Sequence, residues 1–293
     1  MGYVYIMPWV LGFLIFTAFP LVASLYLSLT QYAIITPPKF IGLANFQKAL
    51  FKDELFWGSV LRTGHYAALN VALGLSGSLV AATLLNQHLK GTTILRTLYY
   101  LPSLTPIVAS ALLWSWIFQP EIGVLNYLLE GVGVQGPRWL QSTQWAIPSL
   151  IIMALWGGIG GSRMIVFLAG LQGVPQEMYD SAAVDGANWW HRFRHVTVPL
   201  ISPVIFFNMV LMIIGSCRVF SVSYVATGGG PAYATYFYVY HLFQNAFQYY
   251  SMGYAAALAW LFFAMMLVFT VIQFRASSRW VFYGGEVKQD GGK

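Results

Sequence analysis

Charged residues are scarce in this chain of 293 residues: Asp, Glu, Lys and Arg together make up 8%, against about 25% in soluble domains. Hydrophobic residues make up 58%, so a water-soluble fold is excluded. Cysteine is almost absent too. Cys217 is the only one and lies in an apolar run, which excludes a disulfide within the chain and a thiolate metal site.

Motifs for catalysis and nucleotide binding are also missing. The chain has no Gly-Lys-Ser/Thr segment that could cradle a phosphate, and neither G-x-S-x-G nor H-E-x-x-H occurs. His191 and His195 have helical spacing but lack a third ligand, so we predict no metal site. The net charge of +6 is scattered along the chain, which argues against nucleic-acid binding. Any chemical energy must therefore be supplied by another protein.

Long apolar runs are what the sequence has, and each is long enough to cross a bilayer as a helix. The first run is uncharged and longer than the apolar region of a signal peptide, so we interpret it as a spanning helix and not a cleaved leader. Prolines predict bends in the first and third runs. We expect one all-α, polytopic membrane domain over 1–293, with helices at 3–29, 64–86, 97–118, 145–171, 200–225 and 252–274.

A polar stretch at 176–199 interrupts the apolar pattern between the fourth and fifth runs. Pro175 suits a helix start, residues 181–183 give the helix a face with little bulk, and Gly186 can end it in a left-handed conformation. Residues 189–195 alternate aromatic rings with His and Arg, which suits a second short helix among lipid headgroups. The pattern favours a docking element; the alternatives are an amphipathic loop or a DNA-reading helix-turn-helix.

The same stretch resembles the EAA loop of binding-protein-dependent ABC transporter permeases. The family pattern reads Glu-Ala-Ala, three residues, Gly, nine residues, then Ile-x-Leu-Pro. Its spacing is kept here, and the two departures, Glu to Asp and Ala to Ser, preserve charge or small size. The matching residues are Asp180, Ser181, Ala182, Gly186, Val196, Val198 and Pro199, with Asp185-Gly186-Ala187 on the usual Asp-Gly-Ala.

The resemblance covers nearly the whole chain and is nearest to carbohydrate permeases of the maltose type. It implies a type I ABC importer permease with six transmembrane helices and a cytoplasmic coupling loop, hence a transport subunit and not an enzyme. The implied partners are a second homologous permease, an ATPase dimer that binds ATP and Mg²⁺, and an extracytoplasmic solute-binding protein; no cofactor is expected in this chain. Coupling to the ATPase would involve Asp180, Ser181, Ala182, Asp185, Gly186, Ala187 and Pro199.

Basic residues predict the orientation of the chain. Eight Lys and Arg residues fall on the side of the docking loop and both termini, Lys288 and Lys293 among them, against five on the other side. The positive-inside rule therefore places the docking loop and the C-terminus in the cytoplasm. The resemblance implies that the membrane is the plasma (inner) membrane of a bacterium or archaeon.

Two arginines, Arg163 and Arg218, fall inside the fourth and fifth runs, and no carboxylate occurs in any of the six. Burying such a charge unpaired costs about 2.5–3.5 kcal/mol. Backbone carbonyls, water in a cavity, another subunit or a ligand could compensate it, or the side chain could snorkel to the interface. The glycines at 157–161 favour a cavity beside Arg163, whereas for Arg218 both alternatives stay open.

Matching this chain to maltose-type permeases by offset implies a cavity near the bilayer midplane. With the two arginines, the predicted solute pathway consists of Ser162, Arg163, Met212, Gly215, Ser216, Arg218 and Val219. The frequency of substrates in the family favours a neutral sugar, oligosaccharide or glycoside. An uncompensated guanidinium also suits an anion such as glycerol phosphate or a sugar acid. A membrane-embedded enzyme or scaffold is the remote alternative.

Overall fold

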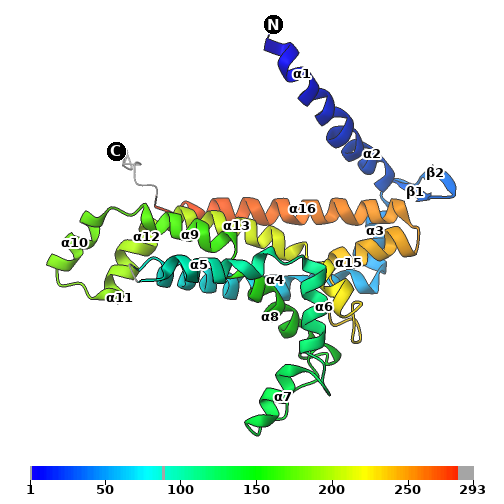
Figure 1. The fold of residues 1–293 in the computed structure, drawn as a ribbon. Helices are drawn as coiled ribbons and strands as arrows, with labels where there is room; N and C mark the ends of the chain where they lie inside the picture. Colours follow the sequence, from blue (N-terminus) through cyan, green and yellow to red (C-terminus); the bar gives the residue numbers. More distant parts are fainter. Residues whose placement is uncertain (1, 88–89, 283–293) are drawn as a thin grey trace. The chain divides into compact units, whose positions relative to one another are not determined.

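The computed structural model describes residues 2–87 and 90–282, so the two tail lysines counted above, Lys288 and Lys293, lie outside the described residues. Helices dominate these residues (Figure 1), and four are long and apolar enough to cross a membrane. Two bent helix pairs qualify as further spans. The prediction of a helical, polytopic membrane protein is confirmed, with up to six spans when each bent pair is counted as one span. The spans are Tyr5–Ser28, Glu54–Leu85, Thr92–Leu104 with Ile107–Ile117, Ala146–Gly158 with Ser162–Gln172, Ser202–Ala226 and Met252–Ser277.

The chain divides into two compact units, which we describe one at a time: residues 1–62 with 236–269, and residues 63–235 with 270–293. The first unit begins with the first span, made of α1 (Gly2–Phe13), a π-helical turn (Leu14–Ala18) and α2 (Phe19–Ser28). Pro20 has no N–H to give to the carbonyl four residues back, and the preceding turn widens, with the Phe19 N–H donating to the Leu14 carbonyl.

A hairpin that the sequence did not predict follows this span. Strand β1 (Thr30–Ala33) pairs antiparallel with β2 (Thr36–Phe40), and Thr30 lies opposite Phe40. Pro37 and Pro38 lie in β2, where they are tolerated because both strands of a two-stranded sheet are edges. The prolines therefore do not exclude a strand at this place.

The core of the first unit joins α3 (Ala44–Gln47) and a π-helical turn (Lys48–Lys52) to α15 (Tyr238–Phe243), a π-helical turn (Gln244–Gln248) and the first part of α16 (Met252–Ser277). The helix that contains the predicted 64–86 span, α4 (Glu54–Leu85), begins ten residues earlier because Asp53 Oδ1 accepts the Leu55 N–H at 3.0 Å. The buried apolar side chains of this core are Ala49, Phe56, Tyr238, Tyr254 and Leu258.

A polar network lies within this apolar core. Asp53 Oδ2 accepts hydrogen bonds from the Tyr254 hydroxyl at 2.5 Å and from His241 Nε2 at 3.0 Å. Burial raises the pKa of Asp53, but the Tyr254 hydrogen bond and the nearby His241 outweigh it, so this pKa lies below its usual value. Burial lowers the pKa of His241 more than Asp53 raises it. At neutral pH the imidazole is thus uncharged and the contact is a hydrogen bond from Nε2–H to the carboxylate.

The second unit holds both bent spans, and each bends where the sequence has Pro or Gly. The helix axes turn by 95° at Pro102 and Pro106, as predicted, and by 53° at Gly160 and Gly161. The elements in order are the rest of α4, α5 (Thr92–Tyr100), a 3-10 turn (Leu101–Leu104), α6 (Ile107–Ile117), α7 (Val124–Gly131), a 3-10 turn (Trp139–Gln141), α8 (Ala146–Gly158), α9 (Ser162–Gln172), α10 (Gln176–Val184), α11 (Trp189–Arg192), a π-helical turn (Phe193–Thr197), α12 (Val198–Leu200), α13 (Ser202–Cys217) and α14 (Ser221–Ala226).

Besides the run 97–118, which bends at its prolines, two further predicted helices are interrupted. The run 145–171 is divided into α8 and α9, and the run 200–225 is divided into α13 and α14 at residues 218–220. At the first break the backbone of Tyr99 lies so close to Gly160 that a Cβ there would overlap its carbonyl. Small residues at 160 and 161 thus let two bent spans meet backbone to backbone.

Small side chains also bring α4, α9 and α13 together. Gly170 of α9 faces the side chain of Val204 of α13, and Ala81 and Ala82 of α4 are buried against α9. The resulting core consists of Ala81, Ala82, Leu85, Met164, Phe167, Leu168, Leu171 and Ile201. It fixes the position of α9, whose first residues line the cavity described next.

Candidate functional site: a solute cavity and a docking loop

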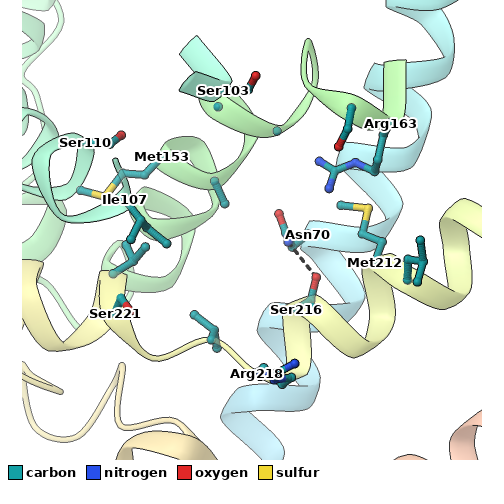
Figure 2. A pocket seen from close by; sticks show the side chains of 18 of the residues that line it. Asn70, Ser103, Ile107, Ser110, Met153, Arg163, Met212, Ser216, Arg218 and Ser221 are labelled. Atoms are coloured by element: carbon teal, nitrogen blue, oxygen red, sulfur yellow. Dashed lines mark hydrogen bonds between the residues drawn. The ribbon is translucent and has the colours of Figure 1, made fainter. Parts of the chain in front are cut away.

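A cavity of about 650 Å³ lies in the second unit, where both bent spans and the α13–α14 break come together (Figure 2). Its volume falls in the range of small-molecule sites, about 300–1,000 Å³. Hydroxyl and amide groups are mixed with apolar side chains in its wall. The lining includes Asn70, Ser103, Ile107, Ser110, Met153 and Ser221.

The residues predicted for the solute pathway lie together in this wall. Ser162 and Arg163 come from α9, and the others come from α13 and the break after it. Their role in transport stays a prediction, but their common location is a feature of the structure. The cavity-lining members are Ser162, Arg163, Met212, Gly215, Ser216, Arg218 and Val219.

Sequence reasoning missed the contributions of α4 and of the first bent span. Tyr66 and Asn70 come from α4, and Ser103, Thr105 and Ser110 come from the segment around the 95° bend. Pro102 and Pro106 were the available signal, because irregular backbone at membrane depth is tolerated where it lines a cavity or is buried in protein. Two prolines a few residues apart inside an apolar run therefore indicate a cavity as well as a bend.

Arg163 is the second residue of α9, directly after the break, and not part of a continuous helix as expected. Its guanidinium lies over Gly158, where a Cβ would overlap Nη2. Its Nε is buried and has no hydrogen-bond partner among the described residues. The arginine therefore lines the cavity with donor capacity that this part of the chain does not use.

Arg218 occupies the second break, as the C-cap of α13, and not the interior of a helix as expected. Its side chain is exposed within the cavity wall. Between the two arginines in the view of Figure 2, Asn70 Nδ2 of α4 donates a hydrogen bond of 2.8 Å to Ser216 Oγ of α13. Both members of that pair are buried, so they satisfy each other across the wall.

The docking loop begins with α10, a helix with no buried residue whose Val184 is 88% exposed. Gly186 has a φ of 74°, as predicted for a helix-ending glycine. The Ala187 N–H donates to the Ala182 carbonyl at 2.9 Å and the Gly186 N–H to the Ala183 carbonyl at 3.1 Å. This pair of bonds is a Schellman motif, which fixes the turn after α10.

The second half of the loop is tied back to the first. Asn188 Oδ1 accepts the His191 N–H at 2.9 Å and caps α11, the short helix that was predicted there. The hydroxyl groups of Tyr179 and Thr197 lie 3.0 Å apart and join α10 to the turn after α11. Pro199 lies inside α12, so the following span, α13, begins at Ser202 and not at the proline. In Figure 1, α10 and α11 project from the second unit beyond α9 and α12.

The remaining coupling residues have simple positions in this loop. Asp180 and Ser181 lie on exposed turns of α10, where Asp180 Oδ1 accepts a hydrogen bond of 3.0 Å from Gln176 Nε2 and Ser181 Oγ donates to the Glu177 carbonyl at 2.9 Å. Asp185 is the C-cap of the helix. These contacts are all local, which leaves the outer face of α10 without a covering element among the described residues.

Comparison with known proteins places this geometry in a family. Residues 74–281 match the family described as "Binding-protein-dependent transport system inner membrane component", and the chain belongs to it. It is 43% identical to the probable ABC transporter permease protein YesP of Bacillus subtilis, over 96% of this chain and 92% of that protein. It is 33% identical to the trehalose/maltose transport system permease protein MalF of Thermococcus litoralis, over 93% and 92% of the two chains.

A solved structure has the same fold over most of its length. The chain is similar to a chain of the bacterial alginate ABC transporter in complex with an alginate pentasaccharide-bound periplasmic protein, with a TM-score of 0.84, 25% identity, and coverage of 94% of this chain and 93% of that one. The chain is thus a multi-pass permease subunit of a binding-protein-dependent ABC importer. It is a transport component and not an enzyme, which removes the enzyme or scaffold alternative.

Proposed function

We propose that this chain forms one half of the translocation pore of a saccharide importer, and that the solute passes through the cavity at the breaks of α8–α9 and α13–α14. One observation carries the proposal: all the predicted pathway residues line the same cavity, which has a volume of about 650 Å³. Trehalose/maltose transport by one relative and the alginate-bound periplasmic protein of another support a saccharide as the solute.

The docking loop couples this pore to ATP hydrolysis in a separate subunit. An ATPase that binds ATP and Mg²⁺ contacts α10 and its Gly186 turn, and this chain holds no cofactor. The exposed face of α10 and the Schellman turn support this role, since a rigid helix with an exposed face can transmit a movement of the ATPase to the pore. The contact residues are Asp180, Ser181, Ala182, Asp185, Gly186, Ala187 and Pro199. The loop and the C-terminus lie in the cytoplasm, as the basic residues favour.

A second, homologous permease completes the pore, so that the working unit is a heterodimer on an ATPase dimer, and each permease acts as a single transmembrane domain. Two features support a partner: the unsatisfied Nε of Arg163 and the exposed side chain of Arg218, both at membrane depth. A binding protein on the external side delivers the saccharide to this pore.

Reconstitution tests the proposal. The chain is co-expressed with the partner permease and the ATPase, purified, and placed in proteoliposomes with the binding protein. We expect saccharide uptake and saccharide-stimulated ATP hydrolysis that require all the components. If the assembled complex hydrolyses ATP but no saccharide-loaded binding protein stimulates it, the solute is not a saccharide. A transport-competent complex of this chain and the ATPase without the second permease would replace the heterodimer by a homodimer.

A further inference from the structure

The charge in the cavity wall has one sign. Among the residues that line the cavity, all of them described, Arg163 and Arg218 are cationic and none is Asp or Glu. The described carboxylates lie elsewhere: Asp53, Glu54, Glu121, Glu130, Glu177, Asp180 and Asp185. Two guanidinium groups at membrane depth without a counter-charge are costly. The residues that line the cavity therefore supply no negative charge to balance the two arginines.

The position of the Arg163 side chain suits the binding of a negatively charged group. The break before α9 positions the side chain, and Gly158 leaves space for the guanidinium because it has no Cβ. Nε is buried without a hydrogen-bond partner among the described residues, so this part of the chain leaves the guanidinium incompletely satisfied. A planar oxyanion can accept two parallel hydrogen bonds from a guanidinium, whereas a single hydroxyl accepts one.

Two helix N-termini add to the positive potential. Helix α9, which has eleven residues, begins at Ser162, and α6, which also has eleven, begins at Ile107; both starting residues line the cavity. The N-terminal end of a helix carries a partial positive charge, and broken helices in transporters direct such ends at anionic groups of the substrate. The helix ends and the two arginines thus favour the same sign of ligand.

We propose, on the basis of the importer function above, that the solute is an acidic saccharide, a sugar that carries an oxyanion, and that Arg163 binds this group with Arg218 as the second cation. A neutral saccharide would satisfy donors with hydroxyl groups but would leave both charges uncompensated. An acidic saccharide compensates charge and hydrogen bonds together. A carboxylate and a phosphate share this chemistry, and separate arms of the experiment distinguish them.

The experiment starts with the binding protein, which is screened by thermal shift against matched probes: trigalacturonate, its trimethyl ester, maltotriose and glucose 1-phosphate, then a wider set of acid and neutral pairs. The saccharide that it selects is used for uptake in proteoliposomes that hold the complete transporter. The variants are Arg163→Met, Arg163→Lys and Arg218→Met. Arg275→Met is the matched control, because it removes an arginine near the C-terminal end of α16 that is not part of the cavity lining.

We expect an acidic saccharide to be selected and Arg163→Met to raise KM or lower the rate at least tenfold, with partial activity in Arg163→Lys, a smaller loss in Arg218→Met and none in Arg275→Met. Uptake of a neutral saccharide that is unaffected by Arg163→Met would overturn this inference and leave the importer function standing. Rescue of Arg163→Met by neutralising a carboxylate in the partner permease would also overturn it, since the arginine would then pair with protein. If no saccharide of either kind stimulates the complex, the importer function fails instead.

Discussion

Asn70 and Ser216 lie 146 positions apart in the chain, yet Asn70 Nδ2 donates a hydrogen bond of 2.8 Å to Ser216 Oγ. The bond joins α4 to α13 in the wall of the cavity, and both residues are buried. Hydrogen bonds between membrane helices contribute about 0.6 kcal/mol on average, with larger values when a buried group is left unpaired.

Removing the acceptor should therefore weaken the wall without closing the pore. We expect Ser216→Ala to lower the Tm of the purified complex by a few degrees and to reduce uptake less than tenfold. Ser221→Ala is the matched control, since Ser221 lines the same cavity but is not part of the pair. Equal Tm values for the two variants would show that the Asn70 amide finds another partner.

Substitution of two glycines near the bend between α8 and α9, Gly157 and Gly160, should have very different effects on folding. A Cβ at Gly160 would overlap the backbone carbonyl of Tyr99, which cannot move without displacing the end of α5, whereas a Cβ at Gly157 would meet only the Pro102 carbonyl at an ordinary 3.8 Å. We expect Gly160→Ala to abolish folding of the complex, measured as the monodisperse fraction after extraction, and Gly157→Ala to resemble wild type. Similar yields would mean that the two bent spans are not in backbone contact.

Local sequence predicted the spans because apolar runs and prolines act within a few residues. The bend at Pro102 and Pro106 and the left-handed Gly186 followed from single residues. The break at Arg218 could not be predicted in this way, since residues 218–220 contain neither Gly nor Pro. The available signal was Arg218 itself, because the free-energy cost of a charge at membrane depth is lowest where a helix ends beside a cavity.

Long-range polar contacts were beyond the sequence for a different reason. Asp53, His241 and Tyr254 meet although 188 and 201 positions separate the carboxylate from its two partners, and no spacing rule connects residues at such distances. The lining from α4 was missed for the same reason: Asn70 belongs to the cavity because of how α4 packs against α13. The residues predicted for the pathway, in contrast, were proposed through the resemblance to a known family, apart from the two arginines, which were proposed because of their charge inside apolar runs.

Gly186 provides a test of the docking loop that depends on backbone conformation. Its φ is 74° and a Cβ would meet nothing within 4 Å in this chain, so within the chain a side chain acts through the left-handed backbone, which costs about 1–2 kcal/mol in residues other than Gly and Asn. We expect transport-coupled ATPase activity to fall in the order Gly, Asn, Ala, Val at this position while membrane insertion is unchanged. Gly91→Val, at a φ of 90° outside the docking loop, is the control. Full coupling in Gly186→Val would contradict the role of the turn.

The network of Asp53, His241 and Tyr254 should make the stability of the complex depend on pH. The pKa of His241 in the folded protein lies below its ordinary 6.5, since burial outweighs the neighbouring carboxylate and Lys48 lowers it further. The unfolded chain therefore binds a proton more readily, and the stability present above about pH 6.5 is lost as the pH falls towards the folded value. Asp53, whose pKa is also lowered, adds a loss only below its usual 3.8. We expect the Tm to fall by a few degrees between about pH 7.5 and 5.5.

His241→Gln, which keeps an N–H for Asp53 but does not titrate, should flatten this slope, while His65→Gln, at an exposed position of α4, should not. Parallel slopes in His241→Gln and wild type would show that another group titrates.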